Sequence, residues 1–579
     1  MDTFSNILAV IGPYYTMFAR WILVFLAIFI LVKSIRSLLQ VKNPSEIWAY
    51  LTGPDGSSTP LTHWENLIGR IPSADVVVNL KSVSRSHGTL VRDAEGIWRY
   101  NDLNSANGSH INGKKVTKPT ILRGGDVLSL GGLDFTLLYV SLAERRDNID
   151  RRKRKSRPIS PWSSLVALTL FQLLTIIQFK VAFGAECPAS IPMGIIGLCA
   201  VMWIYVIVLR SFNRVGFEME TIAFFLSTLS LSVTGSTAFR SVSAGGPGSV
   251  TKQLICVILG VVLFFALCWF LRDLTRAKKI RLLVLAAGAV LLVFTLIFGS
   301  EINGSRSWIT LPGFSIQPSE LVKIAFIIAG AATLDELYQK GNLTIFMLFS
   351  GFCMGCLALM GDFGAAGIFF VTFLVIAFLR SGDFSKLILI IGGVGLAGML
   401  ALTLKPHVKA RFATWGHVWE DPSGAGFQQT RTMSASSNGG LPGVGAGNGW
   451  FHNVYASDTD MVFGILSEEW GYIISVLAIA CIITLGVFAV RSIIAGRSSY
   501  YSIAACAATS LFIFQTALNV LGSVDILPFT GVTFPFVSSG GTSMIASWGL
   551  LAFLKAADTR QNASIAVSLD SKKELGGRE

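Results

Sequence analysis

Stretches of mainly apolar residues recur along this chain of 579 residues, and they limit its possible folds more than any other feature. About twelve such stretches, each about 17 to 25 residues long, lie between Pro161 and Leu554, and another runs from Tyr14 to Val32. A helix of that length crosses a hydrocarbon layer of about 30 Å. The mean hydropathy of +0.61 and the 14% of charged residues are also unlike those of a soluble protein. We therefore expect a polytopic α-helical membrane protein.

The spans predicted after the first one contain few charged residues and are separated by polar turns. They cover residues 161–181, 189–210, 217–235, 251–271, 280–299, 319–335, 344–360, 363–380, 386–404, 472–490, 501–521 and 540–555.

Basic residues gather between the spans, in Arg151–Arg157, Arg272–Arg281 and Arg491–Arg497. Placing these segments in the cytoplasm gives a topology that alternates without conflict, as the positive-inside rule expects. Segments 300–318, 405–471 and 522–539 then lie outside. The basic residues behind the net charge of +13 thus serve to orient the spans in the membrane, and we expect no nucleic-acid partner.

Changes in composition divide the chain into six parts. We expect an N-terminal transmembrane anchor (1–42), a cytoplasmic domain (43–142), a basic linker (143–160), two further transmembrane helices (161–212), a membrane core (213–558) with an outer loop at 405–471, and a polar, disordered cytoplasmic tail (559–579).

The domain at 43–142 has the pattern of an all-β sandwich. Short apolar alternations such as Asp75–Asn79 and Val127–Leu130 are separated by Gly, Asn, Asp and Pro turns. Three polar clusters stand out between the alternations, at Gly69–Arg70, Ser84–His87 and Asp102–Gly113.

With these clusters the domain resembles the forkhead-associated (FHA) family, whose β-sandwich binds phosphothreonine peptides through loops at one end. The resemblance implies that Arg70, Ser84, Arg85 and Asn107 hold the phosphate, that Asn112 holds the peptide backbone, and that His87 braces the loop. An Arg fork with hydroxyl and amide donors suits a phosphate dianion. Ser109 stands where the family usually has Thr. The alternative function for this domain is a β-sandwich that serves as a spacer and binds no ligand.

Four groups of sequence motifs follow one another along the membrane core. They are Asn303–Ile309 with Gln317–Lys323; Gly361–Ala366; Trp419–Gln428 with Thr459–Asp460 and Glu468–Gly471; and Leu527–Gly531 with Pro535–Gly541. From about residue 217 to 555 the chain resembles the SEDS family of shape, elongation, division and sporulation proteins (FtsW, RodA, SpoVE). The resemblance implies a ten-span peptidoglycan glycosyltransferase that polymerises lipid II on the outer face of the bacterial plasma membrane, with about three extra spans added here.

The outer loop carries the expected catalytic residue. Within Trp419–Gln428 the resemblance assigns Asp421 as the base that deprotonates the attacking sugar hydroxyl. Pro422 and two glycines would fix the turn that aims the carboxylate, and Glu420 is the rival candidate. The alternative is that Asp421 only caps a turn.

Further ionisable groups are expected in a substrate cavity. Glu320 and Lys323 are three residues apart and share a helix face, and an ionisable pair in a membrane is costly unless it lines a polar space. The resemblance to the SEDS family also places Asp362 and Ser538 in this cavity. Cations available to a lipid diphosphate are Arg306, Lys409, Arg411 and Arg431.

We expect no dedicated metal centre, because His407, His417, His452, Asp458 and Asp460 do not have metal-ligand spacing. A divalent cation such as Mg²⁺ could share the diphosphate. Asp458 and Asp460 are expected to be structural or to orient the substrate.

The predicted function is therefore lipid II polymerisation, regulated or localised by phosphothreonine recognition. Two alternatives are a flippase for a lipid-linked precursor, using Glu320, Lys323 and Asp362, and a non-catalytic scaffold of the cell-wall machinery. Expected partners are a class B penicillin-binding protein transpeptidase and a phosphothreonine-bearing protein or Ser/Thr kinase substrate. A role in division, elongation or sporulation is left open.

Overall fold

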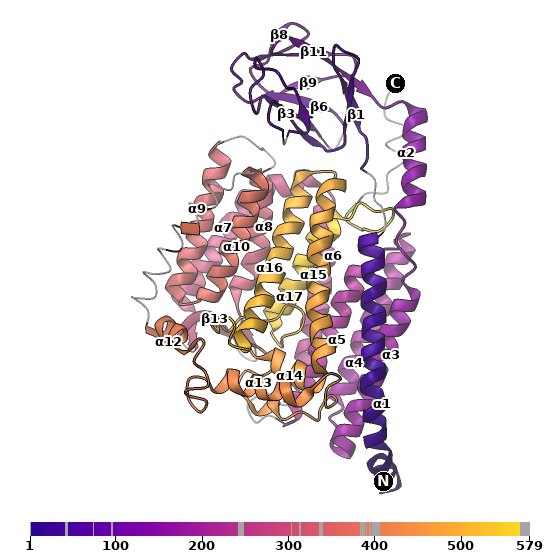
Figure 1. The fold of residues 1–579 in the computed structure, drawn as a ribbon, viewed down its shortest axis with the longest axis vertical. Helices are drawn as coiled ribbons and strands as arrows, with labels where there is room; N and C mark the ends of the chain where they lie inside the picture. Colours follow the sequence, from indigo (N-terminus) through magenta and orange to yellow (C-terminus); the bar gives the residue numbers. More distant parts are fainter. Residues whose placement is uncertain are drawn as a thin grey trace.

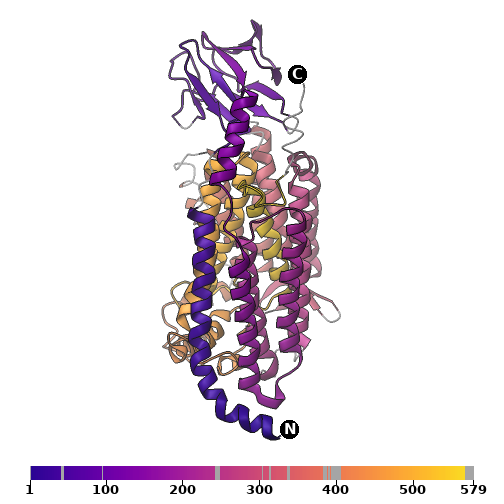
Figure 2. The same cartoon turned by 90° about the vertical axis from the view of Figure 1, so that its right-hand side faces the viewer.

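The computed structural model describes the chain apart from residues 1, 41–44, 73, 94–95, 241–247, 303, 312–313, 335–339, 382–387, 389–390, 393–394, 396–405 and 568–579. A bundle of long helices carries a β-sandwich at one end and a layer of short helices at the other (Figures 1 and 2). We call these ends the sandwich end and the loop end. The predicted fold class, a helical membrane protein with an inserted all-β domain, is confirmed.

The sandwich consists of two mostly antiparallel sheets, in the strand orders β2-β1-β11-β10-β7-β8 and β4-β3-β5-β6-β9. Side chains such as Leu90, Trp98 and Tyr100 from one sheet and Leu128 and Leu137 from the other are fully enclosed between them. The strands are β1 (Ala49–Thr52), β2 (Ser58–Leu61), β3 (Glu65–Gly69), β4 (Val76–Val77), β5 (Gly88–Arg92), β6 (Trp98–Asp102), β7 (Ser109–Ile111), β8 (Lys114–Lys115), β9 (Thr120–Leu122), β10 (Val127–Leu130) and β11 (Leu133–Tyr139).

The bundle consists of helices that match the predicted spans. They are α1 (Asp2–Ile35), α3 (Trp162–Phe183), α4 (Ser190–Ser211), α5 (Glu218–Arg240), α6 (Gly248–Leu271), α7 (Leu274–Phe298), α8 (Pro318–Leu334), α9 (Lys340–Met360), α10 (Phe363–Ser381), α15 (Gly471–Ala495), α16 (Ser499–Ser523) and α17 (Gly541–Ala557). Among the described residues, eight helices are long and apolar enough to cross a membrane: α1, α3 to α7, α15 and α16. The predicted span 386–404 falls almost wholly outside the described residues.

The N-terminal anchor and the two extra helices pack onto the rest of the bundle and share its hydrophobic core (Figure 2). The Tyr15 hydroxyl of α1 donates a hydrogen bond to the Leu174 carbonyl of α3 at 2.7 Å. Phe171 of α3 stacks on Trp470 at a centroid distance of 5.3 Å and meets Phe225 of α5 edge-on. The added helices therefore form one body with the core.

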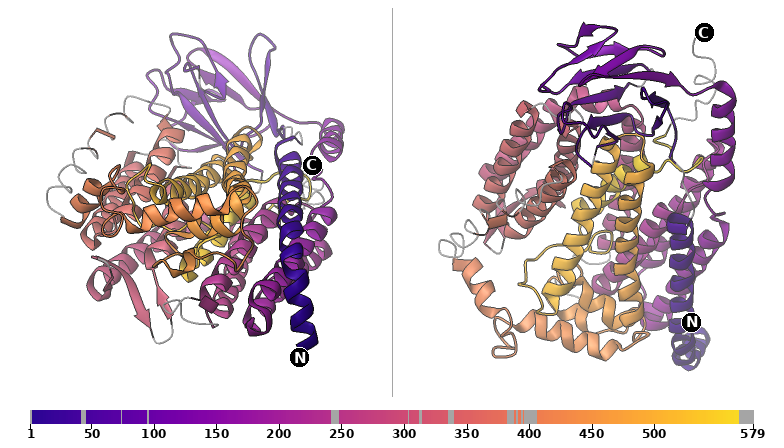
Figure 3. Two further views of the ribbon diagram at one scale, coloured as in Figure 1. Left: turned by 60° about the horizontal axis from the view of Figure 1, so that its bottom comes forward. Right: turned by 45° about the horizontal axis from the view of Figure 1, so that its top comes forward.

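The loop end contains regular secondary structure of its own. Its polar segments form a small sheet and short helices that cross the end of the bundle (Figure 3). These elements are β12 (Ser300–Ile302), β13 (Ser305–Leu311), β14 (Phe314–Ile316), α12 (Pro406–Thr414), α13 (Phe427–Gly439), η3 (Phe451–Asn453) and α14 (Val462–Glu469).

Two segments at the sandwich end differ from the prediction. The basic linker contains a helix, α2 (Leu142–Lys155), and the tail is packed rather than disordered as far as Val567. The Arg560 guanidinium is buried against Asp558 and Glu218, at 2.8 and 3.1 Å, and donates to the Ser37 carbonyl at 3.0 Å. Ser37 belongs to the π-helix η1 (Arg36–Gln40) that follows α1. Paired charge explains the order, because Arg560 joins the tail, the anchor and α5.

We predict that Arg560→Met lowers the thermal stability of the purified protein strongly, since it leaves the Asp558 and Glu218 carboxylates buried without their cation. Loss of one partner from a buried pair costs about 3–5 kcal/mol, against about 0–1 kcal/mol for an exposed pair. Arg276→Met is the matched control, because its pair with Asp273 is solvent-exposed. Equal melting temperatures of the two variants in detergent would contradict the prediction.

Candidate functional site

A cavity of about 300 Å³ lies in the bundle next to the loop end, where several predicted site residues converge. Its charged lining consists of Glu320 of α8, Asp362 between α9 and α10, Arg411 of α12 and Asp460 from the turn before α14. The remaining lining includes Ser305, Ser307, Trp308, Gln317, Tyr455, Thr459, Thr530, Thr533, Ser539 and Gly540. The cavity is therefore polar and ionisable within an apolar bundle.

The predicted pair between Glu320 and Lys323 is present. The Lys323 ammonium donates to the Glu320 carboxylate at 2.6 Å and to the Gln515 side-chain oxygen at 3.0 Å. Both charged residues are buried, and Glu320 lies in the first turn of α8, where the helix dipole favours a negative charge. Because Glu320 lines the cavity, the pair places an anchored charge at its wall.

Asp362 is held on the same wall by two donors. Its carboxylate accepts the Ala365 N–H at 2.9 Å, which caps α10, and the Gln317 side-chain amide at 3.2 Å. Ser538 lies behind the wall: its hydroxyl donates to the Thr459 carbonyl at 2.6 Å and accepts the Phe534 N–H at 2.8 Å. Asp362 is thus positioned in the cavity, whereas Ser538 braces the backbone beside it.

Asp460 was not predicted as a catalytic group, yet it lines the cavity. Its backbone carbonyl accepts the Asn519 side-chain amide at 2.9 Å, which fixes the turn. Burial raises the pKa of Asp460 to about 7, while the Arg411 charge opposes the rise and the Asp458 and Asp362 charges add to it. A carboxyl group that titrates near neutral pH can act as a general base or acid.

Two polar residues of the site were also missed. Gln515 bridges Lys323 and the Thr533 hydroxyl, at 3.0 and 2.8 Å, and Gln317 bonds Asp362. Gln515 had a usable signal, because a polar amide in the middle of an apolar span is costly unless it has a partner. Arg411, a predicted cation, does reach the cavity and donates to the Thr530 carbonyl at 3.2 Å.

The structure does not bring Asp421 into the cavity lining. The exposed Asp421 side chain accepts the Gly424 and Ala425 N–H groups at 3.0 and 2.9 Å, so it caps its own turn. The loop nevertheless lies beside the cavity, since the Gln428 side chain donates to the carbonyl of Tyr455, a lining residue, at 3.0 Å.

The other predicted cations are exposed and do not line the cavity. Arg306 pairs with Glu301 at 3.3 Å, Arg431 lies 5.3 Å from the Phe427 ring centroid, and Lys409 projects from α12. Across the described part of the chain, no three His, Cys, Asp or Glu side chains converge as a metal site.

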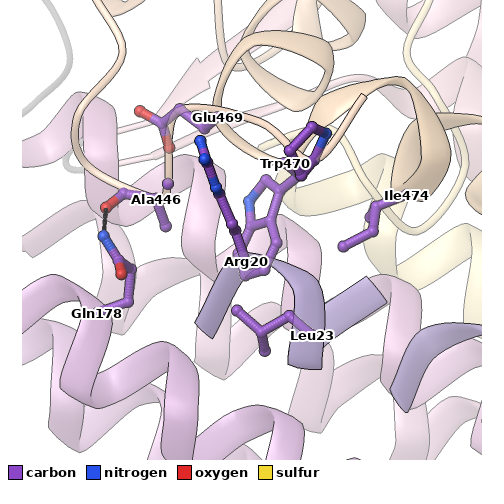
Figure 4. A pocket seen from close by; sticks show the side chains of 9 residues that line it. Arg20, Leu23, Gln178, Ala446, Glu469, Trp470 and Ile474 are labelled. Atoms are coloured by element: carbon purple, nitrogen blue, oxygen red, sulfur yellow. Dashed lines mark hydrogen bonds between the residues drawn. The ribbon is translucent and has the colours of Figure 1, made fainter. Parts of the chain in front are cut away.

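A second, much smaller pocket joins the anchor to the loop end (Figure 4). Arg20 and Leu23 of α1 face Glu469 and Trp470, and Gln178 of α3 donates to the Ala446 carbonyl at 3.4 Å. Its volume of about 10 Å³ would hold a single water molecule. This pocket is a small gap in the packing of α1 and α3 against the loop end of the core.

The loops assigned to phosphothreonine binding lie together at one end of the sandwich. The Arg70 and Ile71 N–H groups donate to the Ser84 and Arg85 carbonyls, at 3.0 and 3.1 Å, and the Ser84 hydroxyl accepts the Ala106 N–H at 3.0 Å. The Arg85 and Asn107 side chains are exposed. The predicted phosphate ligands therefore share one surface.

Two other residues of the sandwich hold its loops in place. Buried His87 receives the Ser84 N–H at 3.1 Å and contacts the Gly108 carbonyl at 3.3 Å, which is the bracing role expected of it. Asn112 has a φ of 48°, and its side chain bonds Asp126 and the Val127 N–H. Its amide thus shapes a turn in this structure, and a contact with peptide stays a prediction.

Comparison with known proteins agrees with both parts of the chain. A family model described as a cell cycle protein, FtsW/RodA/SpoVE, matches residues 218–563, and an FHA domain model matches residues 66–131.

Among curated proteins, the peptidoglycan glycosyltransferase RodA of Mycobacterium tuberculosis is 29% identical over 326 residues, or 53% of this chain and 69% of that protein. Stage V sporulation protein E of Bacillus subtilis is 31% identical over 309 residues, or 51% and 82%. The probable peptidoglycan glycosyltransferase FtsW of Pseudoalteromonas translucida is 33% identical over 302 residues, or 49% and 75%.

A solved chain from a peptidoglycan synthase complex has the same fold, with a TM-score of 0.50 and 24% identity; the match covers 60% of this chain and 98% of that one. The matched family region includes every charged residue of the cavity lining, while helices α1 to α4 and the sandwich precede it. The protein therefore belongs to the FtsW/RodA/SpoVE family and carries an FHA domain ahead of the family core.

Proposed function

We propose that this protein is a peptidoglycan glycosyltransferase that polymerises lipid II into glycan strands at the outer face of the bacterial plasma membrane. The carrying observation is the cavity, in which Glu320, Asp362, Asp460 and Arg411 meet inside a core of the FtsW/RodA/SpoVE family. The relatives named as peptidoglycan glycosyltransferases support the reaction class.

The proposed reaction joins the sugar hydroxyl of one molecule to the anomeric carbon of another. A base takes the hydroxyl proton, the C–O bond to the lipid diphosphate breaks, and the diphosphate leaves with the bonding electrons. Arg411 is the cation of the cavity lining that is suited to stabilise the departing charge, whereas Lys323 lies behind Glu320 and is paired with it at 2.6 Å.

Two carboxylates are candidates for the base. Asp421 stands in the loop motif that led us to this family, and its two backbone hydrogen bonds leave lone pairs that face solvent. Asp460 is already in the cavity. We propose Asp421 as the base and Asp460 as the group that adjusts charge in the cavity; the variants below distinguish these roles.

Sidedness and partners complete the proposal. The sandwich lies at one end of the bundle and α12, which contributes Arg411 to the cavity, lies toward the other (Figure 1). A cytoplasmic FHA domain would therefore put the cavity toward the outer face. A class B penicillin-binding protein would crosslink the strands, and a phosphothreonine-bearing protein, such as a Ser/Thr kinase substrate, would bind the FHA domain. The family neighbour from a synthase complex supports a partnered enzyme.

Asp421→Asn is predicted to reduce lipid II polymerisation by about 10²–10⁴-fold, the usual contribution of a general base. Glu420→Gln, which removes the neighbouring carboxylate, should keep most of the activity. The measurement is glycan chain formation by purified protein, with and without candidate transpeptidases. Equal glycan from wild type and Asp421→Asn would contradict the assignment of Asp421.

The same assay tests the rival functions. A flippase would tolerate Asp421→Asn and lose lipid II transport in proteoliposomes on Glu320→Gln or Lys323→Met. A scaffold would make no glycan even as the wild type with a transpeptidase present.

The rate of polymerisation is predicted to fall as the pH drops below about 7, because protonation of Asp460 removes its negative charge from the cavity. In Asp460→Asn this acidic limb should disappear and the rate should be lower across the range. Asp458→Asn is the comparison variant: Asp458 does not line the cavity, so the acidic limb should remain, but it should move to lower pH because the Asp458 charge no longer raises the pKa of Asp460. A pH–rate profile for each protein is the measurement, and an unchanged limb in Asp460→Asn would refute the assignment.

Arg85→Ala is predicted to weaken binding of a phosphothreonine peptide by about 10- to 100-fold, as expected for loss of one charge-assisted contact to phosphate. Arg99→Ala, in the same sandwich but on strand β6, should bind as the wild type does. Fluorescence anisotropy with a degenerate phosphothreonine peptide pool measures the affinity. Binding unaffected by Arg85→Ala would favour the spacer interpretation of this domain.

A further inference from the structure

A buried carboxylate joins the FHA domain to the membrane core. Glu65, at the start of β3, lies against the turn between α15 and α16. Its two oxygens accept the Ser498 hydroxyl at 2.8 Å and the Ser499 N–H at 2.9 Å. Glu65 and Ser498 are only 3% and 1% exposed, so this contact excludes solvent.

Neighbouring groups extend the contact along both segments. The Trp64 N–H donates to the Arg497 carbonyl at 2.6 Å, and the His63 ring nitrogen Nδ1 lies 2.9 Å from the Gly496 carbonyl. The Arg497 side chain in turn pairs with Glu46 of the FHA domain at 3.3 Å. The contact therefore combines backbone pairing with an ion pair, and we call it the FHA dock.

The dock satisfies groups that would otherwise be unpaired at a helix terminus. The first N–H groups of α16 have no partner within the helix, and their end of the helix dipole is positive. Ser498 is the N-cap residue of α16, and its hydroxyl oxygen accepts the Tyr500 N–H. Glu65 adds a full negative charge at this helix end, which is why a carboxylate can be buried there.

The same helix contacts the cavity at its other half. Gln515 of α16 bonds Lys323 and Thr533, and Asn519 donates to the Asp460 carbonyl at 2.9 Å and the Val532 carbonyl at 2.7 Å. A helix of 25 residues spans about 37 Å. Consequently α16 links the dock at the sandwich end with the cavity wall near the loop end.

The phosphothreonine loops lie away from the dock. Strand β3 begins at Glu65 and ends at Gly69, directly before Arg70, so the two regions are separated by the length of the strand, about 16 Å. Among the described residues, no hydrogen bond joins Arg70, Ser84, Arg85 or Asn107 to the turn between α15 and α16. A ligand at the loops would not cover the dock.

We propose that the FHA domain is held on the N-terminus of α16 through Glu65, and that it binds a phosphothreonine segment of another protein at its far end without leaving the dock. The bound protein is thereby held at the sandwich end of the bundle. The dock also holds α16 in the position that its cavity contacts require; this last step rests on the proposed function.

The first test uses the full-length protein in detergent and amide hydrogen exchange. Glu65→Ala should lower protection of residues 496–502 by at least about tenfold, because the dock opens locally. Ser498→Ala on the core side, which also removes the N-cap of α16, should lower it at least as much. Asp55→Ala is the matched control, since this exposed carboxylate of the same domain accepts its hydrogen bonds from Ser57 in its own turn, away from the dock. Unchanged protection in both dock variants would overturn the proposal.

The second test adds the degenerate phosphothreonine peptide pool, with the unphosphorylated pool as control. Glu65→Ala should bind phosphopeptide within about twofold of the wild type, which also shows that the variant domain is folded. Saturating phosphopeptide should leave the protection of residues 496–502 in the wild type unchanged. Increased exchange there on peptide binding would overturn simultaneous docking and binding.

The third test measures polymerisation. An active wild type with reduced activity in Glu65→Ala and Ser498→Ala, and normal activity in Asp55→Ala, supports transmission through α16. Full activity in both dock variants, once exchange has shown that the dock is open, would overturn transmission. An inactive wild type would instead refute the proposed polymerase function, and it would leave the exchange and peptide results standing.

Discussion

Charge that is buried in an apolar helix bundle has to be neutralised within the protein, and this requirement shapes both ends of the molecule. At the sandwich end, Lys555 pairs with Glu220 at 2.8 Å, and Arg560 pairs with Glu218 and Asp558. These pairs attach the C-terminal segment to α5, and Arg560 also reaches the anchor through the Ser37 carbonyl. The anchor is therefore joined to the family core by a hydrogen bond from a buried charge as well as by apolar packing.

Toward the loop end the same requirement produces a site. The pair between Glu320 and Lys323 is as close as those at the sandwich end, but Glu320 borders a cavity. Asp362 and Asp460 share that cavity with Arg411, so charge of both signs is concentrated where a lipid diphosphate could enter. A purely structural ion pair needs no such space. The cavity is thus what separates the proposed chemistry from scaffolding by buried charge.

The two functional regions are far apart but mechanically connected. A phosphothreonine reader at one end of the bundle and a proposed transferase cavity toward the other require either recruitment or transmission. The FHA dock allows both, because Glu65 holds the domain on α16 while the loops at Arg70 and Arg85 stay exposed to a partner. Gln515 and Asn519 of α16 bond Lys323 and the Asp460 carbonyl, so a shift of α16 would move groups at the cavity wall.

The sequence by itself determined the membrane class, the approximate spans, the β-sandwich and the family, because apolar length, alternation and ordered motifs are local properties of the chain. It also predicted the pair between Glu320 and Lys323, whose spacing puts them on one helix face. Only the tertiary structure decided which polar residues meet. It brought Asp460 into the cavity, kept Arg411 of the four predicted cations in the lining, left Asp421, Arg306, Lys409 and Arg431 outside it, and set Glu65 against Ser498, 433 positions away in the chain. Such contacts depend on how helices and domains pack, and no spacing along the chain records that packing.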